Sequence, residues 1–308
     1  MDYDKDLYGP IQEEIKRLKK ERQAVILAHL YQRPEIQDVA DFVGDSLMLA
    51  QEAAKTEAKV IVFCGVHFMA ESAKILSPDK VVLLPELEAG CPMADMVTAE
   101  ALREKKKEHP NATVVCYVNT SAAVKAECDI ACTSSNAVKV INSSPKDKEI
   151  LFVPDRNLGH WVGLQADRDI ILWEGYCNTH ERLSKEDVQS VIDQYPEAKV
   201  LVHPECRPEV VELADGVFST AGIIDYAKKS PSKEFIIATE AGILHQLQLS
   251  CPDKNFYMAS RKLICPNMKA TTIDKVKRAL ETMEPKIEVD QEVAKRSMTC
   301  LERMLAIK

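Results

Sequence analysis

Short runs of β-branched and other apolar residues alternate along the chain with longer amphipathic stretches. Runs of this length are typical of buried strands, and amphipathic stretches between them are typical of the helices that connect parallel strands. The pattern therefore predicts an α/β fold built on parallel sheets. The nine predicted strands are Ala24–Leu30, Val60–Cys64, Val81–Leu84, Thr113–Val118, Glu149–Val153, Asp169–Trp173, Lys199–His203, Glu234–Ala238 and Asn255–Met258.

Three kinds of landmark recur at a period of about 87 residues. In each set of three strands, the first strand ends in two polar residues, a small polar cluster then opens a helical stretch, and a cysteine follows the third strand. This period suits a small α/β domain and exceeds a solenoid unit. We predict three homologous three-layer αβα domains, 14–97, 98–185 and 186–270, with pseudo-threefold symmetry around a central cavity. The landmarks are His29/Tyr31, Tyr117/Asn119 and His203/Glu205; Gly44–Ser46, Thr133–Ser135 and Phe218–Thr220; and Cys91, Cys177 and Cys265.

Both ends of the chain carry helical patterns outside the repeat. The N-terminal segment 1–22 contains a predicted helix at Ile11–Arg22, and the tail 271–308 contains two, at Ile273–Met283 and Val293–Ile307. The apolar residues of the last helix recur at helical spacing. We therefore expect these helices to pack on the three domains.

The net charge of −8 over 308 residues disfavours a nucleic-acid or anionic-membrane partner, because either would favour a basic face. No apolar run approaches the ~20 residues of a membrane span, and the start of the chain lacks the apolar stretch of a signal peptide. Ten cysteines are too few for a disulfide scaffold. We therefore expect a cytoplasmic protein with reduced cysteines that binds neither nucleic acid nor a membrane.

The three repeat-equivalent cysteines are candidate metal ligands. Each lies in a turn sequence after a predicted strand, and α/β sheets bind ligands beyond the carboxyl ends of their strands. Three thiolates fit either a zinc ion with a fourth ligand or a [4Fe–4S] cluster that keeps one iron open. The other cysteines are interpreted as structural, because cysteine is commonly buried. They are Cys64, Cys116, Cys128, Cys132, Cys206, Cys251 and Cys300.

The other landmarks supply candidate substrate-binding groups. Hydroxyls at a helix start either cap the helix or bind carboxylate and phosphate, so three such clusters around one cavity predict a substrate with several acidic groups. A glutamate beside a metal and an imidazole is a natural general acid or base. His180, three residues after a cysteine, is close enough to contact the metal site or the substrate.

Seven segments between about residues 20 and 272 occur in an order that is specific to one family. The segments are Ala28–Gln32, Gly44–Ser46, Gly90–Ala94, Tyr117–Asn119, Gly175–His180, His203–Cys206 and Cys265–Lys269. Together they resemble the quinolinate synthase family. The resemblance implies three related α/β domains around a [4Fe–4S] cluster held by Cys91, Cys177 and Cys265. It also implies that iminoaspartate and dihydroxyacetone phosphate condense to quinolinate, the pyridine precursor of NAD, with release of phosphate and water.

The same resemblance implies roles for individual residues. Glu205, Tyr31 and His203 are the expected catalytic residues, and Glu205 and Tyr31 would move protons while an open iron takes a leaving hydroxyl. An enzyme that supplies iminoaspartate is the expected functional partner. Met268 stands where some members have a second cysteine, which disfavours thiol–disulfide regulation there. The expected substrate-contacting residues are His29, Tyr31, Ser46, Tyr117, Asn119, Ser134, His180, His203, Glu205, Ser219 and Thr220.

Three other functions stay open. The first is another iron–sulfur hydro-lyase, which product identification would separate. The second is a non-catalytic iron–sulfur electron carrier or sensor, although a carrier would favour four cysteines. The third is a sugar-phosphate binder with a zinc site, which metal analysis would separate.

Overall fold

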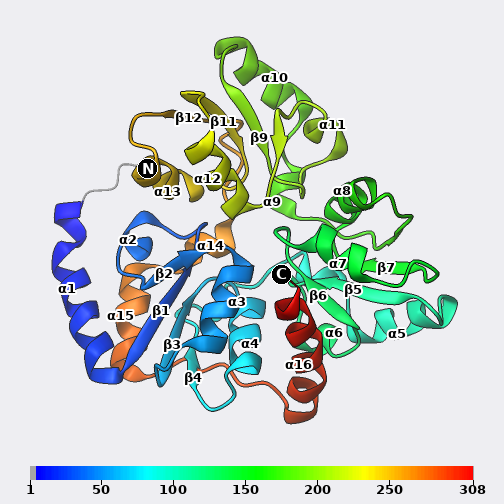
Figure 1. Cartoon of the computed structure of the whole chain (residues 1–308). Helices are drawn as coiled ribbons and strands as arrows, with labels where there is room; N and C mark the ends of the chain where they lie inside the picture. Colours follow the sequence, from blue (N-terminus) through cyan, green and yellow to red (C-terminus); the bar gives the residue numbers. More distant parts are fainter. Residues whose placement is uncertain (1–4, 308) are drawn as a thin grey trace.

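The computed structural model describes residues 5–307, so positions 1–4 of the predicted N-terminal segment and Lys308 lie outside the described residues. Three separate four-stranded sheets follow one another along the chain, and all of their strand pairs are parallel. Figure 1 shows the sheets in three lobes, coloured from blue to cyan, green, and yellow-green. The α/β prediction is confirmed.

The first sheet has the strand order β2-β1-β3-β4, with helices between its strands. Its two inner strands are β1, which pairs with β2 and β3, and β3, which also pairs with β4. The elements of this part of the chain are α1 (Lys5–Arg22), β1 (Ala24–His29), α2 (Pro34–Gln37), β2 (Phe42–Gly44), α3 (Ser46–Lys55), β3 (Val60–Cys64), α4 (His67–Leu76), β4 (Val81–Leu83) and a 3₁₀ turn, η1 (Ala94–Met96).

The second and third sheets repeat this order as β6-β5-β7-β8 and β10-β9-β11-β12. The second comprises α5 (Ala99–Glu108), β5 (Thr113–Tyr117), α6 (Ala122–Lys125), β6 (Ile130–Cys132), α7 (Ala137–Ser143), β7 (Ile150–Val153), α8 (Arg156–Ala166), β8 (Ile171–Leu172) and α9 (Asn178–Glu181). The third comprises α10 (Lys185–Gln194), β9 (Lys199–Val202), α11 (Pro208–Val211), β10 (Gly216–Val217), α12 (Thr220–Lys229), β11 (Glu234–Ala238), α13 (Ile243–Ser250) and β12 (Asn255–Met258).

The sequence pattern missed β2, β6 and β10, because their two or three residues lie in no longer apolar run, unlike the equally short β4 and β8. Each of them pairs with the first strand of its sheet. An aspartate precedes each one, and its carboxylate accepts a hydrogen bond of 2.8 Å from a backbone N–H of that first strand. These aspartates form a fourth landmark of the repeat. The pairs are Asp41 with Ile26, Asp129 with Val114, and Asp215 with Val200.

The helices outside the repeat pack on the sheets, as the apolar pattern of the tail predicted. Ile15 and Leu18 of α1 and Ile273 and Val276 of α15 (Ile273–Thr282) share a buried cluster with β1 and β3. The last helix, α16 (Gln291–Ala306), lies against α4, α6 and β6. In Figure 1, α15 lies beside the first sheet and α16 beside the second. Within residues 5–307, no helix is long and apolar enough to cross a membrane.

Candidate active site

A cavity of about 180 Å³ is lined by the segments that follow strands of all three sheets. In parallel α/β sheets the strand ends leave loops and helix starts free to hold ligands. The structure brings nearly all the predicted site residues into this lining, although the chain separates them widely. They are His29, Tyr31, Ser46, Cys91, Tyr117, Asn119, Ser134, Cys177, His180, His203, Glu205, Thr220 and Cys265.

Cys91, Cys177 and Cys265 are all partly buried residues of this lining. Cys91 lies near enough to both of the others for their thiolates to repel one another. Burial raises the pKa of Cys91 to about 12 and also raises the pKa of Cys177 and of Cys265. Metal binding at these thiols must therefore displace protons.

Each of the three cysteines stands just before a short helical segment. Cys177 precedes α9, Cys265 precedes α14 (Pro266–Ala270), and Cys91 lies three residues before the first residue of η1. Backbone N–H groups at these turns approach the sulfur atoms and favour their thiolate form. These N–H groups belong to Met93 and Ala94 for Cys91, to His180 for Cys177, and to Asn267 and Met268 for Cys265.

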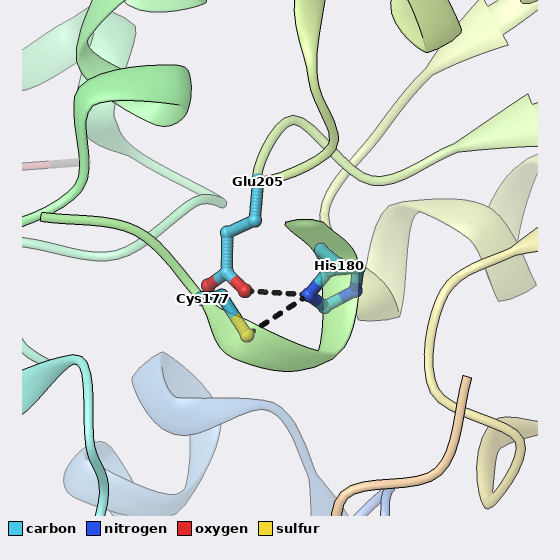
Figure 2. Close-up of side chains that lie close together, drawn as sticks. All are labelled: Cys177, His180 and Glu205. Atoms are coloured by element: carbon cyan, nitrogen blue, oxygen red, sulfur yellow. Dashed lines mark hydrogen bonds and ion pairs between the residues drawn. The ribbon is translucent and has the colours of Figure 1, made fainter. Parts of the chain in front are cut away.

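Glu205 accepts hydrogen bonds from two cavity side chains. The Tyr117 hydroxyl donates to its Oε1 at 2.6 Å, and Nδ1 of His180 lies 2.8 Å from its Oε2. Figure 2 shows Nδ1 of His180 facing both the Glu205 carboxylate and Cys177, whose Sγ is 3.2 Å from this nitrogen. Burial opposes ionisation of Glu205, but His203, His180 and Tyr117 outweigh it and hold its pKa below the usual value. Burial and the Glu205 charge raise the pKa of Tyr117, so this phenol stays a donor.

The hydrogen-bond chain continues from His180 to Tyr31. Nε2 of His180 is 2.9 Å from the Thr239 hydroxyl, which is 2.6 Å from the Tyr31 hydroxyl. Tyr31 is in turn 2.9 Å from the Thr220 hydroxyl. When Nδ1 of His180 donates to Glu205, Nε2 accepts from the Thr239 hydroxyl. Every hydroxyl of the chain then donates toward Glu205. The arrangement connects a tyrosine to a carboxylate through groups that can pass a proton.

His29 and His203 occupy equivalent positions in the first and third sheets. In each ring Nδ1 accepts the backbone N–H of the residue two positions on, Tyr31 at 3.1 Å and Glu205 at 3.3 Å. Burial lowers the pKa of each histidine to about 3. Both are therefore neutral imidazoles at pH 7 that carry their proton on Nε2.

The hydroxyl clusters divide into cavity groups and a helix cap. Ser46 and Ser134 line the cavity, and no side-chain hydrogen bond of either is found within residues 5–307. The Ser219 hydroxyl instead accepts the backbone N–H of Gly222 at the start of α12, and Ser219 is outside the lining. Asp45, not Ser46, caps α3.

Several polar groups of the lining were missed by the sequence reasoning. The side-chain oxygens of Asn119, which was predicted, and of Asn178, which was not, are buried without a partner among the described residues. Such atoms indicate a ligand, since buried oxygens are normally satisfied. Arg182 is exposed and has no side-chain partner within the described chain. It is the one Lys or Arg among the described lining residues.

Two donor sets could hold metal. The three cysteines form one. The other is Cys177, His180 and Glu205, whose ligand atoms lie within 4.8 Å of one another. The hydrogen bonds to Tyr117 and Thr239 already satisfy Glu205 and His180, so proton transfer is the chemistry that this second set supports better.

Comparison with known proteins agrees with this geometry. The profile of a family described as "Quinolinate synthetase A protein" matches residues 13–306. The chain is 58% identical to a quinolinate synthase of Geobacter metallireducens over 297 residues, covering 96% of this chain and 97% of that protein. It is 57% identical to one of Methanosarcina barkeri over 296 residues, with the same coverage of each chain. It is 54% identical to one of Desulforudis audaxviator over 302 residues, covering 98% and 100%.

Proposed function

Because the chain belongs to the quinolinate synthetase A family, and is therefore an enzyme of NAD biosynthesis, we propose that its cavity condenses iminoaspartate with dihydroxyacetone phosphate to give quinolinate, phosphate and water. The convergence of Cys91, Cys177 and Cys265 on one cavity is the observation that most supports this reaction. The three thiols come from segments 86 and 88 residues apart along the chain, and they lie beside a hydrogen-bond network that can transfer protons. A purely structural role for the cysteines does not explain this arrangement.

The three sheets are proposed to belong to three domains, 14–97, 98–185 and 186–270, around a pseudo-threefold axis that passes through the cavity. The common strand order and the repeated aspartate contacts support this division. An enzyme that makes iminoaspartate is the proposed functional partner, and the cytoplasm is the proposed location.

The cofactor of the family is a [4Fe–4S] cluster, and the three cysteines fit it. Their thiols share one cavity, backbone N–H groups approach each sulfur, and no fourth cysteine joins them among the described lining residues. We assign Cys91, Cys177 and Cys265 as the residues that would hold the cluster. When bound, a cluster with three protein ligands supplies an open iron that can act as a Lewis acid.

The proposed work of the protein side chains is proton transfer. Glu205, which is ionised and accepts from Tyr117 and His180, is suited to receive a proton from a substrate carbon or nitrogen. Tyr31 stays protonated because burial and the Glu205 charge raise its pKa, so it is suited to donate a proton to a leaving hydroxyl. Neutral His203 can donate through Nε2 to a substrate oxygen.

Substrate binding is proposed to use hydroxyls, amides and one cation. The three proposed domains, called units below, each bring a polar side chain to the cavity that suits the carboxylates of iminoaspartate. These side chains are Ser46, Asn119, Ser134 and Thr220. Arg182 would attract the phosphate of the second substrate, because guanidinium and phosphate form strong charge-assisted hydrogen bonds. His29 is also proposed to contact iminoaspartate.

The test uses anaerobically purified protein. It should contain about four irons and four sulfides per chain, and it should form quinolinate, identified by mass spectrometry, from dihydroxyacetone phosphate and iminoaspartate generated in the assay. Replacing Cys91, Cys177 or Cys265 by alanine should each remove both the cluster and the product. Cys251, which is buried elsewhere, provides the matched alanine control and should retain both. Cluster loss in the control with retention in the cavity variants would overturn the proposal.

A further inference from the structure

Three chain segments meet beside Tyr31: residues 30–33 after β1, residues 240–242 after β11, and residues 265–269. Nε2 of Gln32 donates to the Met268 carbonyl at 2.9 Å, and Nε of Arg33 donates to the Lys269 carbonyl at 3.0 Å. Gly242 approaches so closely that a Cβ there would come within 2.7 Å of the Tyr31 backbone. We call these three segments the junction.

A buried acid lies at the centre of the junction. The Glu240 side chain is 1% exposed, and both of its oxygens accept backbone hydrogen bonds. Oε1 accepts the N–H of Cys265 at 3.1 Å, and Oε2 accepts the N–H of Gly242 at 2.7 Å. This carboxylate therefore fixes the backbone of the third cysteine directly.

The cation of the junction is Lys269, whose side chain is 10% exposed. Its Nζ lies 3.0 Å from each oxygen of Glu240 and also donates to the Tyr31 carbonyl. One continuous path of hydrogen bonds thus runs from the Cys265 backbone through Glu240 and Lys269 to the Tyr31 backbone.

The second sheet has only half of this arrangement. Register aligns Ala238 with Val202 and Val153 with Cys116, so Glu240 corresponds to Asp155, two residues after β7. Asp155 is also a fully buried acid, and it lies beside the backbone N–H of Cys177. No lysine pairs with Asp155 among the described residues. The lysine is therefore an addition at the Cys265 segment, and it donates to the Tyr31 backbone.

We propose that the Glu240–Lys269 ion pair is a positioning device that holds Tyr31 in a fixed relation to Cys265. This inference rests on the proposed function, in which Tyr31 moves a proton beside the group held by Cys265. A buried ion pair adds little net stability, because desolvation offsets its attraction. The pair instead fixes positions, because Glu240 and Lys269 must both stay where their hydrogen bonds to the backbone are satisfied.

The experiment compares Glu240→Gln and Lys269→Met in the holoenzyme. Misplacement of a reacting group lowers turnover steeply, so kcat should fall roughly 10- to 100-fold, while KM for both substrates should stay within about threefold. Iron content should remain normal. The exposed pair of Lys262 and Asp187, 3.0 Å apart in the third unit, provides the control. Lys262→Met should leave every readout unchanged.

The potential of the cluster shows whether the charges of the pair act at Cys265, and the double variant separates this charge effect from positioning. Glu240→Gln removes a negative charge beside Cys265, which should shift the midpoint potential in the positive direction. Lys269→Met leaves that charge unbalanced and should shift it in the negative direction. The double variant should return toward the wild-type potential but keep the low kcat, because neither positioning hydrogen bond is restored.

Three outcomes decide the inference. A lower melting temperature with unchanged kcat and potential would reduce the pair to a structural contact and overturn the proposal. If Lys269→Met does not fold, Glu240→Gln alone supplies the potential shift, and Lys269→Arg, which keeps the charge but not the geometry, should lower kcat with an unchanged potential; normal kcat in both variants would overturn the proposal. If the wild-type protein forms no quinolinate, the proposed function fails, whereas potential shifts of opposite sign would still support the coupling of the pair to Cys265.

Discussion

Ser134 and Ser219 hold similar positions in the repeat, yet the structure gives their hydroxyls different tasks. Ser134 lines the cavity without a side-chain partner in the described chain, whereas Ser219 accepts the Gly222 N–H at 3.2 Å and caps α12. Alanine at either position removes a serine hydroxyl, but the quantity that changes should differ: ligand binding at one position and stability at the other. We expect Ser134→Ala to weaken ligand binding without loss of stability, and Ser219→Ala to do the reverse.

The two magnitudes follow from the type of contact. A hydrogen bond to a charged carboxylate contributes about 1.5–3 kcal/mol, so Ser134→Ala should raise the Kd of a dicarboxylate analogue of iminoaspartate by roughly 10- to 150-fold. Loss of a helix cap costs about 1 kcal/mol, so Ser219→Ala should lower the melting temperature by roughly 2–4 °C.

Calorimetric titration and thermal unfolding of the anaerobic holoenzyme measure both quantities on the same preparations. Equal iron contents in the two variants ensure that the comparison concerns the hydroxyls alone. Ser134→Ala with normal affinity and a lower melting temperature would refute the assignment of this hydroxyl to the ligand. Loss of affinity in Ser219→Ala would place that hydroxyl in the cavity, against the geometry.

Two further predictions concern charged groups of the cavity. Glu205→Gln keeps the shape of the side chain but not its proton exchange, so the rate of quinolinate formation should fall roughly 10²- to 10⁴-fold. Iron content and melting temperature should stay normal. Near-normal turnover would remove Glu205 from the mechanism. Arg182→Gln should raise KM for dihydroxyacetone phosphate about tenfold or more, as loss of a charged hydrogen bond requires, with KM for iminoaspartate unchanged. Lys185→Gln, a nearby exposed position outside the lining, controls for net charge, and equal KM values in both variants would contradict the phosphate role.

The repeat made most of the fold predictable from sequence. Apolar runs located nine of the strands, and three landmarks of different chemistry aligned the sheets. The edge strands β2, β6 and β10 were missed because they lie in no long apolar run and are held by a tertiary contact, in which a backbone N–H of the first strand donates to the preceding aspartate. Asp41, Asp129 and Asp215 recur at the same period as the cysteines, so the signal was present but looked like ordinary turn chemistry.

The candidate site was predictable where its residues repeat or lie close to a repeated residue, as His180 lies close to Cys177. Thr239, which connects Tyr31 to His180, follows β11 directly, and the equivalent positions after β3 and β7 hold Gly65 and Pro154. A residue with no counterpart in the other units carries no periodic signal. Arg182 was missed for the same reason, because it acts by facing the cavity and not by its place in a motif.

The internal repeat explains both what the three units share and where chemistry separates them. Equivalent strand ends supply equivalent positions, and the side chains at one position can differ between units. One such position holds histidine in the first and third units, His29 and His203, but tyrosine, Tyr117, in the second. Three identical residues there would give a symmetric cavity, whereas a substrate pair such as a dicarboxylate imine and a sugar phosphate is asymmetric. The one-way hydrogen-bond chain from Thr220 to Glu205 and the single lysine of the junction are both departures from the repeat. The site of this fold therefore combines positions that the three units share, which are the cysteines, with cavity-facing positions at which the units differ.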